Sequence, residues 1–293
     1  MVGVTRMRRW LPWYAKMAAK ITLARLPLGY RFWRKINLFA HGSMHKPEYA
    51  HGVFRQHFDR SEFTRKNGGF TALEIGPGDS LLSAVVANAY GASTCYLIDS
   101  GPFATEDMAP YRAIGDYLRS LNLSPPDLEE VSDLKGGLLA ACNAFYGTRG
   151  LSSIRELPSS SVDFIWSHAV LEHIRRHEFP NFMRELRRVL RPDGFCSHRV
   201  DLKDHLGGAL NNLRIPSRLW EADWMARSGF YTNRIRYSEM IELFRQADFD
   251  VNVISVARWD RLPTPRERMA SEFEGFDDDD LLVSAFDVLL KPQ

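Results

Sequence analysis

Cysteine is scarce in this sequence of 293 residues, and long apolar runs are absent from it. Cys95, Cys142 and Cys196 lie far apart and form no C-x-x-C pair, so neither a disulfide framework nor a zinc knuckle is indicated. A reducing, cytoplasmic compartment is therefore expected. No stretch approaches the ~20 apolar residues of a spanning helix. The N-terminal stretch, cut by lysine and arginine, lacks the apolar core of a signal peptide.

Acidic residues are missing from the first 47 positions, which hold ten arginines and lysines among several aromatic residues. The remainder carries 28 basic and 36 acidic residues, a net charge of −8, so a basic front segment precedes an acidic body. Residues 1–40 can form a helical lid, or they can lie on an anionic membrane at its inner face. Both alternatives stay open. Nucleic acid is the least favoured partner, because no RNA-binding module is recognisable.

Beyond residue 69, apolar strands alternate with helical segments, which is typical of an α/β fold with a mostly parallel, doubly wound sheet. We expect two domains, a basic, aromatic-rich helical segment (1–69) and an α/β domain (70–293) with an insert around 202–235. The four aspartates at 277–280 indicate a solvated turn rather than a calcium site, because no EF-hand spacing surrounds them. The expected strands are 70–75, 94–98, 144–146, 162–166, 195–200, 251–256 and 281–290. The expected helices are 80–90, 104–121, 169–190 and 237–247, with a loop at 122–137 and a turn at 192–194.

The turn between the first strand and the first helix reads Leu73-Glu74-Ile75-Gly76-Pro77-Gly78-Asp79-Ser80. Its glycines let a ligand approach the backbone, and Asp99 ends the next strand, where a carboxylate can accept hydrogen bonds from ribose hydroxyls. A P-loop is excluded because no Gly-Lys-Ser/Thr follows, and Asp79 would repel the pyrophosphate of a dinucleotide. The candidate that remains has a ribose and an adenine but no phosphate, S-adenosylmethionine. Glu74 either supports its cationic end or bonds to the neighbouring loop.

With these motifs the chain resembles the class I S-adenosylmethionine-dependent methyltransferases over roughly 70–293. The resemblance also rests on LPSSSVDFIWS (157–167), HAVLEH (168–173) and ELRRVLRPDGF (185–195). It implies a seven-stranded sheet with an antiparallel last strand, and an adenine lined somewhere within 147–152. Ser80 stands where the family often has a third glycine. The cofactor-binding residues that it implies are Glu74, Gly76, Pro77, Gly78, Asp99, Ser167, His168 and His173. For His173, we favour a plain hydrogen-bonded helix histidine over a cofactor contact.

A hydroxyl acceptor would need a general base, whereas a carboxylate acceptor would not. His205 is the best candidate base, with Asp201 and Asp204 close by in the sequence, and His198 is a weaker one. Polar capping of the loop explains the same residues equally well. A metal site is the weakest interpretation, because the spacing matches no ligand pattern. Four aromatic residues of the insert would cover the acceptor or simply pack in a core: Trp220, Trp224, Phe230 and Tyr231.

These observations together predict an enzyme that transfers a methyl group from S-adenosylmethionine to a small-molecule, saccharide or lipid-linked glycan acceptor, at oxygen. The alternative is a catalytically idle homologue that binds the cofactor and serves as a partner in a larger assembly. The set of Glu74, Gly76, Gly78 and Asp99 favours the enzyme. The sequence names neither the acceptor atom nor the oligomeric state.

Overall fold

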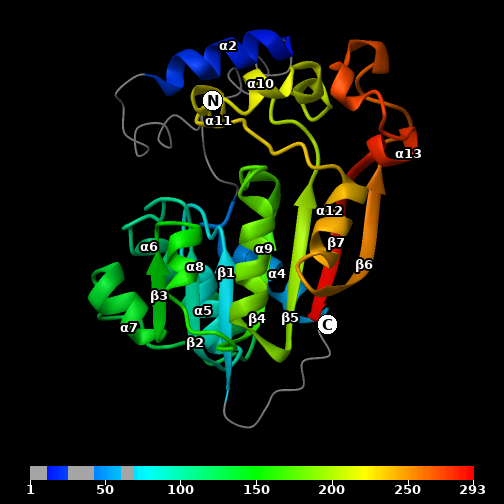
Figure 1. Ribbon diagram of the computed structural model, residues 1–293. Helices are drawn as coiled ribbons and strands as arrows, with labels where there is room; N and C mark the ends of the chain where they lie inside the picture. Colours follow the sequence, from blue (N-terminus) through cyan, green and yellow to red (C-terminus); the bar gives the residue numbers. More distant parts are fainter. Residues whose placement is uncertain (1–11, 26–42, 61–68) are drawn as a thin grey trace.

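A seven-stranded sheet forms the centre of the computed structural model, which describes residues 12–25, 43–60 and 69–293 (Figure 1). The strands are β1 Phe70–Ile75, β2 Ala92–Ile98, β3 Ala144–Gly147, β4 Val162–His168, β5 Leu190–Asp201, β6 Phe249–Arg258 and β7 Val283–Pro292. The longer helices are α2 Trp13–Ala24, α4 Pro47–Phe58, α5 Leu82–Ala89, α6 Ala109–Ser120, α9 Phe179–Val189 and α12 Tyr237–Arg245. The short ones are η1 Leu134–Leu138, α7 Leu139–Ala141, α8 Leu151–Arg155, η2 Leu171–His173, η3 Asn211–Arg214, α10 Ser217–Trp220, α11 Asp223–Ala226, η4 Arg266–Arg268, η5 Ser271–Phe273 and α13 Asp278–Leu281.

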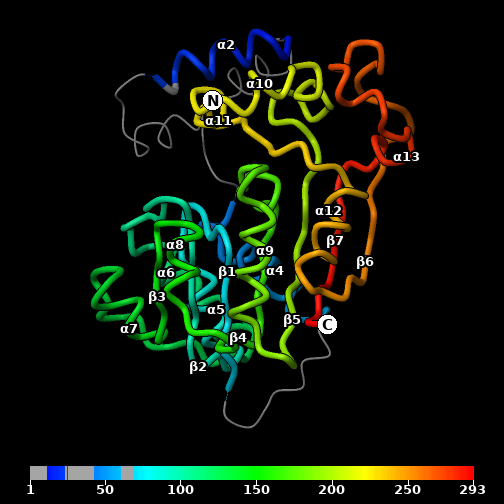
Figure 2. The backbone as a smooth tube through the Cα atoms, viewed as in Figure 1, coloured from blue at the N-terminus to red at the C-terminus, as the bar shows by residue number. Residues whose placement is uncertain are grey.

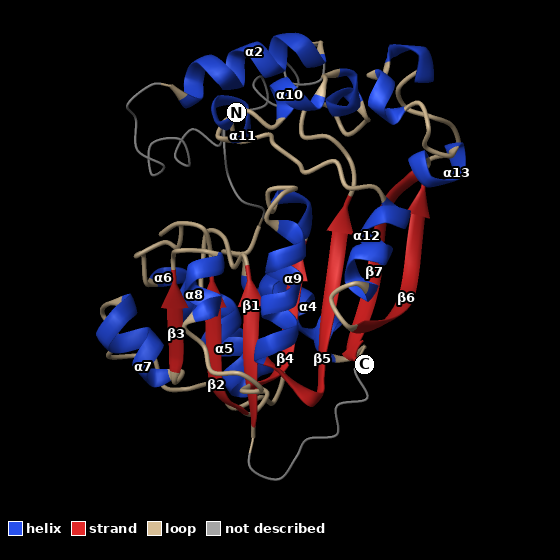
Figure 3. Cartoon of the chain, in the orientation of Figure 1, coloured by secondary structure: helices blue, strands red, loops and turns tan. Residues whose placement is uncertain are grey.

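The strand order is β3-β2-β1-β4-β5-β7-β6. The neighbours from β3 to β5 pair in parallel, and β7 runs antiparallel between β5 and β6 (Figure 3). The predicted mostly parallel, seven-stranded sheet with its antiparallel last strand is confirmed. The carboxyl ends of β1 to β5 share one side of the sheet, called the carboxyl edge below. Ligands of open α/β sheets bind at this edge.

Each face of the sheet carries its own apolar core. On one face α4, α5 and α6 pack on the strands, with Phe54, Tyr111 and Trp166 buried among them. On the other face α8, α9 and α12 enclose a second core around Phe179 and Phe244. Residues of β4 alternate between the two cores, as the two-residue period of a strand requires.

Three segments differ from the sequence-based expectation. The helix expected at 169–190 is two pieces, η2 and α9, because Ala169 has φ +56° and Pro180 lies in the first turn of the second helix, which begins at Phe179. The turn expected at 192–194 is instead a bulge within β5, whose pairing with β4 jumps from Leu190 to Phe195. The loop expected at 122–137 ends early, because η1 begins at residue 134. The other expected helices and strands occur, with ends shifted by a few residues.

The basic front segment contributes two helices to the described residues. Helix α4 packs into the core of the sheet through Phe54 and its neighbours. Helix α2 lies beyond the carboxyl edge, across α10 and α11 of the insert (Figure 2). Trp13, Met17 and Ile21, one helical turn apart, pack on the insert, and Arg214 lies over the Trp13 ring at 5.2 Å. Residues 1–69 thus reach both the sheet and the insert, and a domain boundary at 69/70 stays a prediction.

Candidate functional site

The glycine turn between β1 and α5 has the backbone that its sequence predicts. Gly76 and Gly78 have φ values of +72° and +70°, which glycine adopts without strain. A Cβ atom at Gly76 would lie 2.6 Å from Cγ2 of Val170, so the chain itself fills the space beside this glycine. Pro77 and Gly78 are buried within the turn. Glycine is thus required here by the fold, before any ligand is considered.

Asp99 directly follows β2 and holds the glycine turn in place. Its Oδ2 accepts a hydrogen bond from the N–H of Gly78 at 3.0 Å, and its Oδ1 accepts one from the N–H of Ser100 at 2.7 Å. A carboxylate can accept about four hydrogen bonds, so ribose hydroxyls fit as further donors. The N–H of Gly150 donates to the Asp99 carbonyl at 2.8 Å. Asp99, the predicted ribose ligand, and the segment expected to line the adenine, 147–152, therefore lie side by side.

Glu74 is buried one position before the end of β1. It accepts a hydrogen bond from the Ser83 hydroxyl of α5, so its partner lies in the helix rather than in the loop that the sequence suggested. Burial raises the pKa of Glu74 to about 8, and the hydrogen bond from Ser83 opposes this shift. The carboxyl is therefore mostly neutral at pH 7. A cation bound nearby would favour its charged form.

The end of β4 carries the most unusual backbone at the carboxyl edge. Ala169 has φ +56°, a strained value for a residue with a Cβ atom, and its N–H donates to the Arg199 carbonyl at 2.8 Å. Such strain is often found at functional sites. His168 precedes it, half-buried, and its Nδ1 lies 3.2 Å from Nε2 of His57 in α4. Burial lowers the pKa of His168 to about 4, with Arg199 adding to the effect.

Ser167 and His198 form a separate pair on the opposite face of the sheet. Ser167 Oγ lies 2.7 Å from His198 Nδ1, and both residues are fully buried. His198 Nε2 has no hydrogen-bond partner among the described residues. Burial lowers the pKa of His198 to about 3. Side-chain alternation along β5 turns this fully buried histidine into the core, and its role as the weaker candidate base stays a prediction.

His205 lies in the loop after β5, beyond the carboxyl edge, and its side chain is exposed. Its ring stacks on that of His173, with centroids 4.9 Å apart and planes at 28°. His173 in turn donates from Nδ1 to the Tyr231 carbonyl at 2.8 Å, as a hydrogen-bonded helix histidine would, and a cofactor contact of this residue stays a prediction. Neighbouring groups partly desolvate the His205 imidazole and lower its pKa, and the charge of Asp201 opposes this shift.

The two aspartates near His205 have other partners. Asp204 is buried and accepts hydrogen bonds from the N–H groups of Leu206, Gly207 and Gly208 and from Asn211. Its carboxylate organises the loop, which is the capping alternative, and it does not orient His205. Asp201 accepts from the N–H of Lys203 at 2.9 Å and from its Nζ at 3.2 Å. Asp201 thus acts on His205 through its charge, which raises the pKa of the imidazole, as does the charge of Asp204, whereas Lys20 and Lys203 lower it.

Two residues at the edge were missed by the sequence analysis. His57 is fully buried and contacts His168, and the signal for it was the amphipathic spacing of the buried residues His51, Phe54 and His57. Glu172 follows β4 and is also buried, with Oε1 accepting from the N–H of Asp201 at 3.3 Å. Its Oε2 has no partner in the described part of the chain, and burial raises its pKa to about 8.

Three of the four insert aromatics pack in a core, and the fourth is exposed. Trp220, Phe230 and Tyr231 are buried against α2 and each other, which is core packing. Trp224 is 45% exposed, with the guanidinium of Arg25 over its ring at 5.8 Å. The three buried rings support the loop that carries His205.

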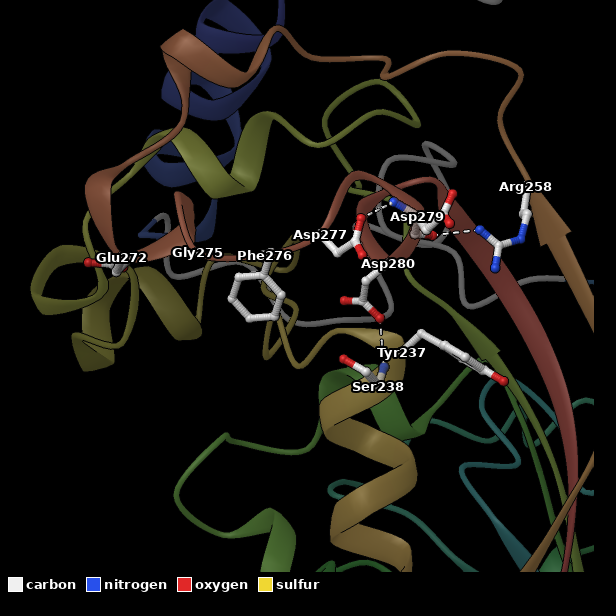
Figure 4. Close-up of a pocket in the computed structure, with 9 residues that line it drawn as sticks. All are labelled: Tyr237, Ser238, Arg258, Glu272, Gly275, Phe276, Asp277, Asp279 and Asp280. Atoms are coloured by element: carbon white, nitrogen blue, oxygen red, sulfur yellow. Dashed lines mark hydrogen bonds between the residues drawn. The ribbon is translucent and has the colours of Figure 1, made fainter.

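The aspartate run at 277–280 forms a helix start beside a pocket of about 530 Å³ (Figure 4). Asp277 caps α13 by accepting from the N–H of Asp279, and Asp280 accepts from the N–H of Ser238 at 2.7 Å. Arg258 donates to the Asp279 carbonyl at 2.6 Å. Within the described ranges no cluster of three or more histidine, cysteine, aspartate or glutamate residues could hold a metal ion. The expected solvated turn is thus a capped helix end.

Comparison with known proteins identifies part of the chain. Residues 109–197 match the family model described as "Methyltransferase domain". No curated protein matches the chain. The match begins after the glycine turn and Asp99, so these two features are independent of it.

Several solved structures are similar at low identity. The YcgJ protein from Bacillus subtilis is 15% identical with a TM-score of 0.43, covering 84% of this chain and 99% of its own. A phosphoethanolamine N-methyltransferase 2 from Haemonchus contortus, solved with S-adenosylhomocysteine, is 14% identical with a TM-score of 0.44, and the match covers 87% of this chain and 55% of that one. A SAM-dependent methyltransferase from Methanosarcina mazei is 15% identical with a TM-score of 0.42, covering 76% and 93%.

Proposed function

We propose that this chain, a class I S-adenosylmethionine-dependent methyltransferase, methylates an oxygen of a small-molecule, saccharide or lipid-linked glycan acceptor that lies beneath its insert. The observation that carries the proposal is the arrangement of the carboxyl edge. There Asp99 is joined to the glycine turn, and the strained end of β4 lies beside a loop with an exposed histidine. These parts come from separate strands and converge where ligands of this fold bind.

The cofactor supplies a methyl group on a sulfonium, so the protein needs no nucleophile of its own. Asp99 supports the proposed ribose contact, and Gly150 lies beside it for the adenine. Pro77 and Gly78 bring the turn close to the methionine part, with Glu74 behind them. We propose that Ser167, on the buried side of β4, supports this contact only through His198 and the strand. The chain's main task is then alignment of donor and acceptor.

His205 is the proposed general base. Because its pKa lies below the ordinary value of 6.5, the imidazole is neutral at pH 7 and can take the acceptor's hydroxyl proton. The bound cofactor would supply the methyl group, its carbon–sulfur bond breaking as the oxygen–carbon bond forms, and the hydroxyl proton would pass to a ring nitrogen of His205 and then to solvent. Stacking on His173 holds the ring. We propose that Asp201 acts through its charge, which stabilises the imidazolium that forms.

The front segment is proposed to act as a lid. The apolar side of α2 packs on the insert, and Lys20 Nζ donates to the His205 carbonyl at 3.3 Å, which links the helix to the loop of the base. Within the described residues no helix is long and apolar enough to cross a membrane. Contact with an anionic membrane through 1–40 involves residues 1–11 and 26–40, which lie outside the described residues, and stays a proposal.

The experiment for this proposal is a calorimetric titration of the full chain with S-adenosylmethionine. Saturable binding is expected, weakened when Asp99 is replaced by alanine. No binding would reject the proposal. The alternative, a cofactor-binding homologue that is catalytically idle, predicts the same titration but no transfer of a labelled methyl group to any acceptor.

A further inference from the structure

His57, Ser197 and His168 form a hydrogen-bonded chain inside the face of the sheet that α4 covers. His57 Nδ1 lies 2.8 Å from Ser197 Oγ, in the middle of β5, and His57 Nε2 lies 3.2 Å from His168 Nδ1, at the end of β4. The two rings are 5.5 Å apart and nearly perpendicular. His57 and Ser197 are fully buried, whereas His168 is half-buried. The chain therefore runs from the interior of the sheet to its carboxyl edge.

Both imidazoles are neutral at pH 7. Burial lowers the pKa of His57 well below its usual value, and the nearby His168, Arg60, His198 and Arg199 add to this effect. Around His168, Arg199 and Arg60 lower the pKa and Asp287 of β7 raises it. Asp287 itself forms ion pairs with Arg60 and Arg199, both at 2.9 Å, and accepts from Ser255 of β6, which balances these charges locally. Each neutral ring then has one donor and one acceptor nitrogen.

Ser197 determines the direction of proton donation along this row of hydrogen bonds. Among the described residues, its hydroxyl has no hydrogen-bond partner except His57. A buried hydroxyl that only accepted would leave its hydrogen without a partner, at a cost of about 1–3 kcal/mol. Ser197 therefore donates to Nδ1 of His57, so Nε2 of His57 carries the proton and donates to Nδ1 of His168. The remaining proton of His168 is then on Nε2.

We infer that His57 is a positioning residue, which fixes His168 as the tautomer that presents an Nε2–H donor at the carboxyl edge. This donor is suited to a carboxylate or other anionic oxygen, either of the cofactor's amino-acid part or of the acceptor. Resting on the proposed function, the inference adds that His168 binds an oxygen there and is not the general base. It also explains why a helix from the front segment is packed into the core beside the site.

Nitrogen NMR of labelled histidine in the full chain, without cofactor or acceptor, tests the tautomer. His168 is expected to show a protonated Nε2 and an unprotonated Nδ1 between pH 6 and 8. Ser197→Ala should produce a mixture of both tautomers. Ser167→Ala, which removes the matched hydroxyl on the opposite face, should change His198 and leave the His168 signals in place. A protonated Nδ1 of His168 in the wild type, or His168 signals that do not change in Ser197→Ala, would overturn the inference.

His57→Phe tests the functional half, with His57→Gln as the conservative control, because the glutamine amide can still donate to His168. For His57→Phe we expect a loss of at least tenfold in cofactor affinity if the oxygen belongs to the cofactor. A similar loss in methyl transfer with unchanged affinity is expected if it belongs to the acceptor. His57→Gln should recover most of either loss. Unchanged affinity and transfer in a folded His57→Phe variant would refute a binding role for His168. The tautomer is measured without ligands. If the proposed function is wrong, the NMR result is therefore unaffected, and the two failures can be told apart.

Discussion

The two halves of the carboxyl edge are built in different ways. In the half formed by β1, β2 and β3, where we propose the nucleoside (the nucleoside half below), the proposed ligand-binding residues contact the ends of neighbouring strands, as Asp99 contacts Gly78, while Ser80 of the turn donates to the Met44 carbonyl of the front segment. In the acceptor half, formed by β4, β5 and the insert, the contacts come from distant parts of the chain. His57 of α4 reaches His168, and Lys20 of α2 reaches the His205 carbonyl. The front segment therefore reaches both halves, but only in the acceptor half does it contact His168 and His205 themselves.

This comparison predicts that loss of the base in the acceptor half changes turnover, whereas substitutions in the nucleoside half change cofactor affinity. The largest effect is expected for His205→Ala. Loss of a positioned base should lower turnover by about 10²–10⁴-fold, with cofactor affinity nearly unchanged. Because the base must be neutral, the wild-type rate should fall as pH drops through a pKa below 6.5. A variant with full turnover and the wild-type pH profile would reject His205 as the base.

Asp99→Ala should affect the other half. The loss of hydrogen bonds to a charged acceptor is expected to weaken S-adenosylmethionine binding by about 1.5–3 kcal/mol, measured by calorimetry. Because Asp99 also holds Gly78, Asp99→Asn is the matched variant, which keeps one acceptor oxygen for the turn. It should weaken binding less. Equal affinity in all three proteins would mean that the ribose lies elsewhere.

The protonation of Glu74 gives a second test of cofactor binding in the nucleoside half. Its pKa of about 8 makes it mostly protonated at pH 7, and a bound sulfonium or ammonium would lower that pKa. Binding at pH 7 should therefore release up to about one proton, seen as a calorimetric enthalpy that depends on the ionisation enthalpy of the buffer. Glu74→Gln should abolish this dependence. If the variant keeps the same dependence, the proton comes from another group.

The sign of the Glu74 effect on stability follows from the same pKa. The folded value lies above the ordinary 4.5, so the folded protein binds more protons than the unfolded chain between pH 4.5 and about 8. The contribution of Glu74 to stability is therefore lost as the pH rises through that window. Thermal unfolding of the wild type and of Glu74→Gln should diverge across it.

The smallest effect is expected for Trp13→Ala on α2. The contact of Trp13 with Arg214 contributes about 0.5–1 kcal/mol, so the variant should expose the front segment to protease while cofactor affinity stays the same. Tyr14→Ala is the control, because the Tyr14 side chain is 58% exposed. Equal protease resistance of the two variants would contradict a docked lid.

The nucleoside half could be predicted from the sequence because its signals are local. The apolar strand 70–75, the glycines after it and the acid after the next strand are close together in the chain. The acceptor half could not be predicted, because strand register determines which side chains meet there. A one-residue difference along β5 separates Ser197, which contacts His57, from His198, which points into the opposite core. Likewise, no local pattern shows that the Asp204 carboxylate accepts its hydrogen bonds from the backbone of its own loop.

The division of η2 from α9 shows a second limit. The residues from 169 to 190 have apolar spacing that fits one helix, yet Ala169 adopts a positive φ and closes β4 against the glycine turn through Val170. The positive φ lies where the ends of two neighbouring strands, β1 and β4, pack together. It marks the edge that the proposed donor and acceptor share.

Isotope-labelled methyl transfer tests the central proposal most directly. The full chain is incubated with S-adenosylmethionine labelled at the methyl group and a cell extract, and the products are followed by mass spectrometry. We expect the label to appear in an oxygen-methylated product and to fall sharply with either Asp99→Ala or His205→Ala. Saturable cofactor binding with no labelled product in any extract would contradict the enzyme and support the idle homologue.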